Sequence, residues 1–223
     1  MSGYASLTEK AMLYGIKVLP ASTARCISAV GRFGVLGEQP EIVPWPIANL
    51  QPGTGISPVT EGSFSVYRHE NLIKGMNHAV QSDHYNGEYD IAKITHDGGF
   101  ALRELNFHAC GEQVFEPIEN NPFMLVLAPH RVPKPIFESI CAYRFDGTRP
   151  VVVSAGVWHA PPIPLGDRAD FITRQAAVHS CVVYDTFADN GNYYLHIPRE
   201  EITEIEKAIK KRFAGIPPTR NLV

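Results

Sequence analysis

The residues best suited to chemistry in this sequence are two histidines and one glutamine, carried by two short stretches. His108 and Gln113 belong to residues 103–117, and His159 belongs to residues 156–161. The alternation of GEQVFEP predicts a strand that begins near Gln113, and a tight connection precedes it. Paired strands can aim all three side chains into one cavity. We therefore expect a compact polar site inside an otherwise apolar fold.

This residue set favours proton-transfer chemistry. Histidine titrates near neutral pH, so His108 and His159 can each act as a general base or a general acid. A structural role is the alternative for each residue. His159 follows an apolar strand and could be a core histidine, and Gln113 could hydrogen-bond the backbone at a strand end.

The composition indicates one ordinary globular domain. The 223 residues are 44% hydrophobic and carry a formal net charge of −3, which predicts a buried core and no basic surface for nucleic acid. No apolar run approaches the ~18 residues of a membrane helix, and the first residues lack a signal-peptide pattern. The four cysteines have no regular spacing, so we expect reduced thiols in a cytoplasmic protein.

Short strand-like runs recur from Ser63 to about Pro198. Ten runs at roughly ten-residue spacing, separated by turn signals, predict a mainly β fold, either a sandwich or a barrel. The chain is expected to divide into an extension over 1–15, a β domain over 16–198 and a tail over 199–223. Within it we expect a short helix over about 22–30, a Pro/Gly-rich loop over 38–60 and an amphipathic helix over 199–213.

Four motifs carry a family resemblance. They are Val18-Leu19-Pro20, the His108-to-Pro117 motif with Gln113, Val157-Trp158-His159, and Asp170-Phe171-Ile172-Thr173. In this order and spacing, the sequence resembles the ureidoglycolate lyases of allantoin breakdown. That resemblance implies a cupin-like antiparallel β-barrel (a double-stranded β-helix). The chain departs from the family at Asn106 and at Lys93, which stands where the family has an arginine.

The resemblance also implies a reaction and roles for named residues. Cleaving ureidoglycolate to glyoxylate and urea needs a base, an acid and a positive group for the substrate carboxylate. The implied catalytic residues are His108, His159 and Gln113. The implied substrate-binding residues are Lys93, Arg103, Trp158 and Asp170.

Several alternatives stay open within this resemblance. One divalent transition metal on His108, Gln113 and His159 could act as a Lewis acid, although the set lacks a carboxylate ligand. Lys93 could face solvent, and Trp158 could be packing. The protein could also be a cupin enzyme for another small hydroxy- or keto-acid, or a non-catalytic binder. We expect a homodimer with a small carboxylate as its ligand.

Overall fold

The computed structural model confirms the mainly β fold. It describes residues 11–21, 27–41, 60–69, 72–79, 87–109, 111–129, 134–175 and 182–213. Most of the loop expected over 38–60 and of the helix expected over 22–30 lies outside these residues. Of that helix, Ile27 is helical and a turn follows, closed by the Val30 N–H donating to the Ile27 carbonyl at 2.8 Å.

The strands form two sheets. The larger has the order β1 (Met12–Gly15), β17 (Tyr193–Ile197), β7 (Phe100–Leu102), β6 (Gly87–Ile94), β5 (Leu72–Ala79), β4 (Thr60–His69), β15 (Arg168–Gln175), β9 (Gln113–Pro117), β12 (Val151–Val153), β3 (Gly31–Phe33). The smaller has the order β16 (Val182–Asp185), β8 (Glu104–Phe107), β13 (Trp158–His159), β10 (Phe123–Ala128), β11 (Cys141–Phe145), β2 (Val18–Pro20), with β14 (Ile163–Pro164) beside β10.

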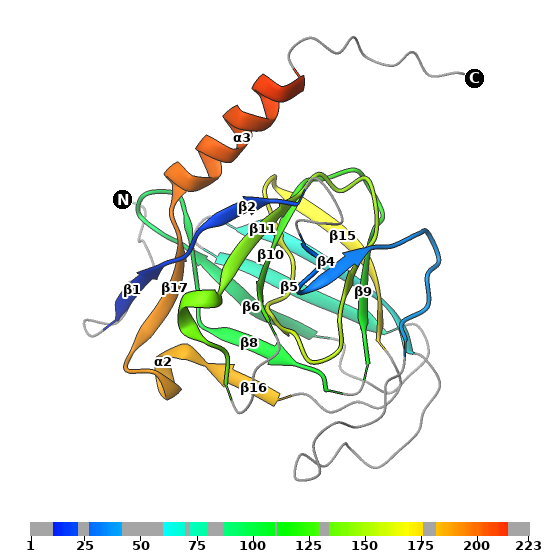
Figure 1. The fold of residues 1–223 in the computed structure, drawn as a ribbon, viewed down its shortest axis with the longest axis horizontal. Coiled ribbons are helices and arrows are strands. Elements are labelled where there is room, and N and C mark those ends of the chain that lie inside the picture. The colour runs from blue at the N-terminus through cyan, green and yellow to red at the C-terminus, as the bar shows by residue number, and fades with distance from the viewer. Residues whose placement is uncertain are drawn as a thin grey trace.

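The two sheets pack against each other around one apolar core (Figure 1). Phe123 of β10 contacts Phe171 of β15 across the layers, with ring centroids 4.8 Å apart. Phe33 of β3 contacts Phe145 of β11 in the same way at 6.0 Å. Neither sheet closes on itself, so the expected cupin-like architecture takes the form of a sandwich.

Residues 100–107, expected as one strand, divide at Arg103. Its first half is β7 in the larger sheet and its second half is β8 in the smaller. The corner is held because the Arg103 carbonyl accepts from Thr186 N–H at 2.8 Å and its guanidinium pairs with Asp185 at 3.0 Å. The chain thereby passes from one layer to the other, and β8 comes to lie beside the strand that carries His159.

The sequence also did not predict strands β5 and β1. β5 pairs with β4 on one side and β6 on the other, so it is an internal strand despite its mixed sequence LIKGMNHA. β1 lies within the predicted extension 1–15 and pairs in parallel with β17. The division of the chain at residues 16 and 199 stays a prediction.

The C-terminal helix α3 (Arg199–Phe213) has the bounds that the periodicity predicts. Ile202 is fully buried and Ile205 packs against the core, so the first turns dock on the sandwich while the helix leads away from it (Figure 1). Two short helical turns, η1 (Phe137–Ser139) and α2 (Thr186–Asp189), complete the described helices. Asp185 caps α2 by accepting from the N–H groups of Phe187 and Ala188.

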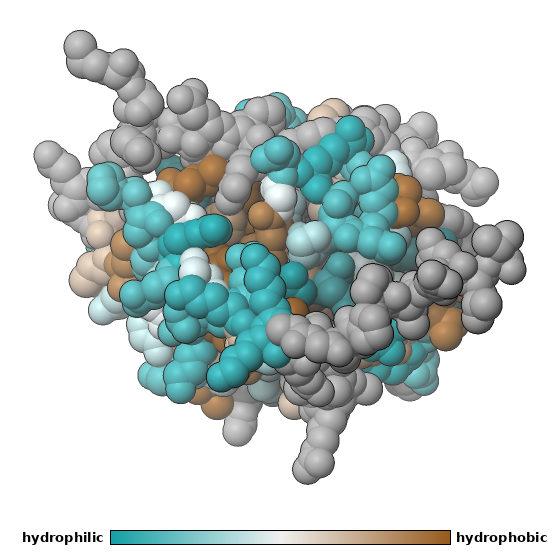
Figure 2. All heavy atoms as spheres, turned by 90° about the horizontal axis from the view of Figure 1, so that it is seen from above, coloured by the Kyte–Doolittle hydropathy of each residue, from teal (hydrophilic) through white to brown (hydrophobic). Residues whose placement is uncertain are grey.

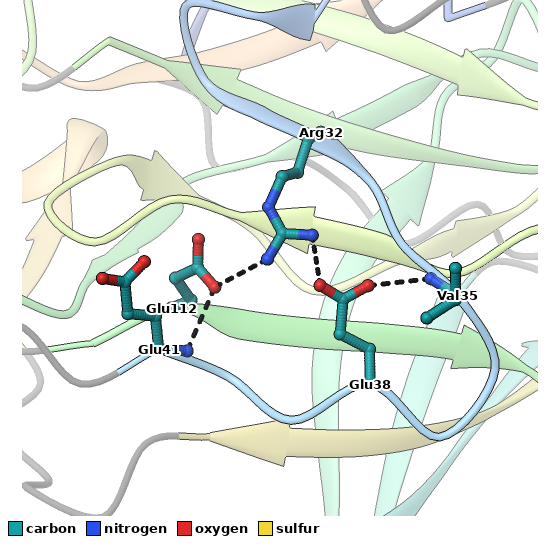
Figure 3. Close-up of polar contacts among 5 residues, drawn as sticks. All are labelled: Arg32, Val35, Glu38, Glu41 and Glu112. Carbon is teal, nitrogen blue, oxygen red and sulfur yellow. Dashed lines mark hydrogen bonds and ion pairs between the residues drawn. The ribbon is translucent and has the colours of Figure 1, made fainter.

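A charged network fixes the chain next to the start of β9. Arg32 of β3 pairs with Glu38 and with Glu112, the latter at 3.1 Å (Figure 3). Glu112 also accepts from the Glu41 N–H at 3.1 Å, and Glu38 accepts from Val35 N–H at 2.8 Å. Because Glu112 immediately precedes Gln113, this network holds the strand end that presents Gln113 to the interior.

One face of the molecule is mostly polar. On the face in Figure 2, hydrophilic side chains predominate and hydrophobic ones appear in smaller patches between them. Within the described part of the chain, no helix is long and apolar enough to span a membrane.

Candidate functional site

His159 lies at the centre of the sandwich. It sits on β13 between β8 and β10, where its register partners are Asn106 and Leu127. The side chain is buried, at 3% exposure. Its Nδ1 lies 3.0 Å from the carbonyl oxygen of Val157. Since a carbonyl can only accept, this contact requires the proton on Nδ1 and leaves a lone pair on Nε2 of the neutral ring.

Gln113 meets that lone pair from the facing sheet. The side-chain amide of Gln113 lies 2.6 Å from Nε2 of His159, with Oε1 as the nearer atom. An oxygen acceptor there suits a protonated ring, whereas a neutral ring needs the amide turned by half a rotation so that its N–H donates. The carboxamide can serve both states, so the pair stays hydrogen-bonded whichever way His159 is protonated.

Burial decides which state prevails at neutral pH. Removal from water lowers the pKa of His159 from 6.5 to about 4, although the hydrogen bond to the Val157 carbonyl opposes the shift. His159 is therefore neutral at pH 7. The ring is better suited to holding Gln113 in place than to carrying a proton.

His108 lies beside this pair and is half-buried. It follows the end of β8, and its ring centroid is 5.0 Å from that of His159. Its carbonyl accepts from Gly156 N–H at 2.7 Å, in the turn that leads into β13. Gly156 has a φ of 75°, a conformation that glycine adopts without strain. The two stretches therefore come together, through β8 and β13, but Gln113 reaches His159 from β9 of the facing sheet and not from a paired strand as expected.

A second glutamine, Gln175, completes the cluster. It ends β15 directly opposite Gln113 of β9. Its Nε2 lies 3.3 Å from Nε2 of His108. Gln175 lies outside the motifs that predicted the site, although alternation along DFITRQ places it on the same inward face as Phe171. What the sequence did not show is that β15 pairs with β9, which brings the two amides side by side.

The cluster thus has two histidines on the smaller sheet and two amides on the larger. Phe115 of β9 closes one side, with its ring centroid 6.3 Å from that of His159. All four polar groups are uncharged when the rings are neutral. Such a site can accept, donate and relay protons to a small polar ligand, and it supplies no fixed charge of its own.

The predicted carboxylate-binding residues lie elsewhere on the same fold. Lys93 is on β6, where its register partners are Leu72 and Ala101, and β5 and β4 stand between β6 and β15 in the sheet. Arg103 is at the corner between β7 and β8, with its guanidinium 5.8 Å above the Phe187 ring. Neither is brought into direct contact with the histidines, and their binding roles stay predictions.

Trp158 and Asp170 make other contacts. Trp158 is buried and packs on Phe107 and Tyr184, with ring centroids 4.8 and 6.0 Å away. Adjacent strand residues alternate, so it lies on the opposite side of β13 from His159. Asp170 pairs with Arg168 at 2.7 Å. It lies five residues before Gln175 on a regular strand and so faces the other way.

Carboxylates are absent from the cluster as far as the structure describes it. No group of three or more His, Cys, Asp or Glu residues in the described ranges could hold a metal ion. Glu112, one residue before Gln113, turns outward to Arg32. The predicted metal set has only two such residues, His108 and His159, beside the amide of Gln113. The finding therefore does not test that set, which stays a prediction.

An open groove of about 910 Å³ lies away from this cluster, between α3 and the turn after β6. Asp97 in that turn accepts from Thr95 and, at 3.0 Å, from the N–H of Arg199 at the start of α3. These contacts satisfy an N–H that the helix leaves unpaired. The groove shares no lining residue with the histidine cluster, and Asp97 on its wall attaches the start of the helix.

Comparison with known proteins identifies relatives. The sequence model of the ureidoglycolate lyase family matches residues 59–188, more than half of the chain. A ureidoglycolate lyase of Azotobacter vinelandii is 34% identical over 100 residues, covering 44% of this chain and 58% of the relative. One from Pseudomonas putida strain F1 is 33% identical over 87 residues, covering 38% and 52%. The chain thus spans about half the length of the curated relatives it matches. The region that the family model matches includes all four cluster residues.

Proposed function

Because this chain belongs to the ureidoglycolate lyase family, we propose that it cleaves ureidoglycolate to glyoxylate and urea. The observation that supports this most directly is the buried Gln113–His159 pair, 2.6 Å apart, with His108 beside it. All three residues lie inside the region that matches the family. These groups can donate and accept the protons that a lyase reaction moves.

The reaction is an internal redistribution of one proton and one bond. The carbon that carries the carboxylate also carries a hydroxyl group and the ureido nitrogen. Removing the hydroxyl proton lets the oxygen form the carbonyl of glyoxylate while the carbon–nitrogen bond breaks. The nitrogen takes up a proton and leaves as urea. One proton is lost from oxygen and one is gained by nitrogen, so no water and no redox partner is consumed.

His108 is the proton carrier in this proposal. It is half-buried, so solvent can stabilise its charged form, whereas burial disfavours the charged form of His159. A single imidazole can accept the hydroxyl proton and then deliver it to the nitrogen. His159 and Gln113 then act as a neutral unit that hydrogen-bonds the substrate and fixes its position.

The substrate carboxylate needs a positive partner. Lys93 and Arg103 remain the proposed binders, one on β6 and one at the corner before β8. Arg103 is already paired with Asp185, so using it would mean exchanging one carboxylate for another. We expect Lys93→Met to raise KM for ureidoglycolate more than Arg103→Met does.

A divalent metal fits these residues poorly. The donors are uncharged, and Glu112, the carboxylate next to Gln113 in the sequence, is paired with Arg32. The amide oxygen of Gln113 and Nε2 of His159 are 2.6 Å apart, closer than the roughly 3 Å between neighbouring ligand atoms at usual metal bond lengths. If a metal were held, His108, Gln113 and His159 would be its ligands and it would polarise the hydroxyl group. Activity that survives dialysis against a chelator is the expected result.

Assembly and location are also part of the proposal. β1 is the outermost strand of the larger sheet and exposes Met12 and Leu13, each at 45%. An exposed apolar edge strand can pair with its copy, so we propose a homodimer through β1. Leu13→Lys should shift light scattering from dimer to monomer. A cytoplasmic location is consistent with the free thiol of Cys141.

The decisive experiment is an assay on racemic ureidoglycolate that follows glyoxylate, urea and ammonia. The protein should release glyoxylate and urea above the spontaneous rate, and His108→Gln should lower kcat about 100-fold or more. His96→Asn, at an exposed histidine in the turn after β6, is the matched control and should retain the parent rate. Ammonia in place of urea, or no turnover by folded protein, would overturn the proposal.

A further inference from the structure

Gln175 is the member of the cluster that the motifs did not point to. We propose that Gln175 is a positioning residue for His108: its amide holds the imidazole in the orientation needed for proton transfer and remains bonded to it as the proton comes and goes. This inference rests on the proposed lyase function for its kinetic part. Its structural part, the coupling between Gln175 and His108, stands on geometry alone.

The geometry couples the two side chains across the sandwich. Gln175 ends β15 in the larger sheet, and His108 follows β8 in the smaller. Their nearest nitrogen atoms are 3.3 Å apart. The backbone of His108 is fixed separately, through its carbonyl and Gly156 N–H. The amide at Nε2 opposes rotation of the ring about its side-chain bonds.

A carboxamide suits a proton carrier. Its N–H donates to the lone pair of a neutral imidazole, and after a half-turn its oxygen accepts from the N–H of an imidazolium. Because the amide is uncharged, it favours neither state strongly. A carboxylate at the same place would stabilise the imidazolium and raise the pKa of His108, while an apolar side chain would leave the ring without this contact.

The position of Gln175 supports a shared design with Gln113. The two residues are directly opposed on neighbouring antiparallel strands, and each amide contacts one histidine of the facing sheet. Gln113 serves the fully buried ring and Gln175 serves the half-buried one. The two amides therefore have different roles. Gln113 hydrogen-bonds the neutral ring of His159, and Gln175 hydrogen-bonds His108, the ring that takes up the proton.

The first test measures the coupling without any substrate. Imidazole resonances of His108, assigned with His108→Gln, are titrated by NMR in the parent protein, in Gln175→Glu and in Gln175→Met. We expect Gln175→Glu to raise the midpoint by about 1 pH unit or more. Gln175→Met, similar in length but unable to hydrogen-bond, should change the balance of the two neutral tautomers. An unchanged His108 titration in Gln175→Glu would overturn the coupling.

Thr173→Val is the matched control. Thr173 lies two residues earlier on the same inward face, and among the described residues its hydroxyl has no hydrogen-bond partner. The exchange is nearly isosteric and should leave the His108 titration as in the parent. A shift equal to that of Gln175→Glu would mean that any change on this strand perturbs the ring, and would overturn the specific role of Gln175.

The second test is kinetic. Gln175→Met should lower kcat about tenfold or more while KM stays within twofold, because the amide orients the ring rather than binding the substrate. Gln175→Glu should move the acidic limb of the kcat–pH profile to higher pH, in step with the NMR midpoint. Parent kcat and an unmoved profile in both variants would overturn the positioning role. If the parent itself lacks turnover but the NMR coupling is present, the lyase proposal fails and the pairing stands.

Discussion

Gln113 and Gln175 occupy directly opposed positions on β9 and β15, and their amides reach different histidines of the facing sheet. The pairing places two neutral donor–acceptor groups against two imidazoles, with the Phe115 ring beside them. It follows that the chemistry of this site depends on strand register as much as on residue type. A shift of one residue between β9 and β15 would turn one amide to the outer face.

The first prediction concerns the hydrogen bond between Gln113 and His159. Gln113→Met keeps the side-chain length and removes the amide, which leaves a buried ring nitrogen without that partner. We expect the free energy of unfolding to fall by about 1–3 kcal/mol, measured by urea denaturation. Gln39→Met, at an exposed glutamine that bonds the Gly37 carbonyl, should change it by less than about 0.5 kcal/mol. Equal urea midpoints for Gln113→Met and Gln39→Met would contradict this account of the Gln113–His159 hydrogen bond.

The second prediction is a pH dependence of stability. The pKa of His159 is lowered by burial to about 4 in the folded protein, against 6.5 in the unfolded chain. Between these values the unfolded chain binds more protons, so stability is complete above pH 6.5 and falls as the pH drops toward 4. The loss from this one ring should reach about 3 kcal/mol.

His159→Gln isolates this contribution. The variant has no titrating ring, so its free energy of unfolding should decline less steeply than that of the parent between pH 6.5 and 4. The difference between their free energies of unfolding at pH 7 reflects packing and is not part of the prediction. Parallel stability curves over this interval would show that His159 is not held neutral by burial.

The sequence identified three of the four cluster residues because His108, Gln113 and His159 each sit in a motif with a strand signal. It missed Gln175 because nothing local to DFITRQ reveals which strand lies beside it. The pairing of β9 with β15 joins residues about sixty positions apart, and such long-range register depends on the whole sheet. The one sequence signal for Gln175 was its place as a polar residue at the end of an alternating strand run.

The fold was predictable to a similar degree. Alternating runs and turn residues indicated the strands, and the 3.6-residue periodicity located α3. The corner at Arg103 was not visible, because β7 and β8 read as one continuous strand until the contacts with Asp185 and Thr186 bend the chain. Mixed sequence also hid β5, whose strand form comes from pairing on both edges rather than from its own pattern.

The third prediction concerns the buried ion pair on the outer face of the same two strands. Arg174 of β15 pairs with Glu116 of β9 at 2.6 Å, with side-chain exposures of 6% and 12%. Glu116→Ala leaves a buried guanidinium without this carboxylate and should cost about 3–5 kcal/mol, measured by urea denaturation. Arg168→Ala breaks the ion pair with Asp170. Because the Arg168 side chain is 55% exposed, the free energy of unfolding should fall by at most about 1 kcal/mol. Similar losses in both variants would contradict the role of burial.

The last prediction concerns how α3 is attached. The residue before the helix is Pro198, which has no side-chain acceptor, and Asp97 of the β6–β7 turn accepts from Arg199 N–H in its place. Partial burial alone would raise the pKa of Asp97. Hydrogen bonds from Thr95 and from the N–H groups of Arg199 and Gly99, with the charge of His196, outweigh it and lower the value to about 2.

The contribution of Asp97 should therefore be complete above about pH 4 and disappear as the pH falls through 2. At pH 7, Asp97→Ala should cost about 1 kcal/mol, as the loss of a helix cap does, and should speed amide exchange in the first turn of α3. Asp146→Ala removes an aspartate that accepts from Thr148 in the turn after β11, and it should leave exchange in α3 unchanged. Equal exchange rates in the parent and in Asp97→Ala would mean that packing of Ile202 and Ile205 holds the helix to the sandwich without this hydrogen bond.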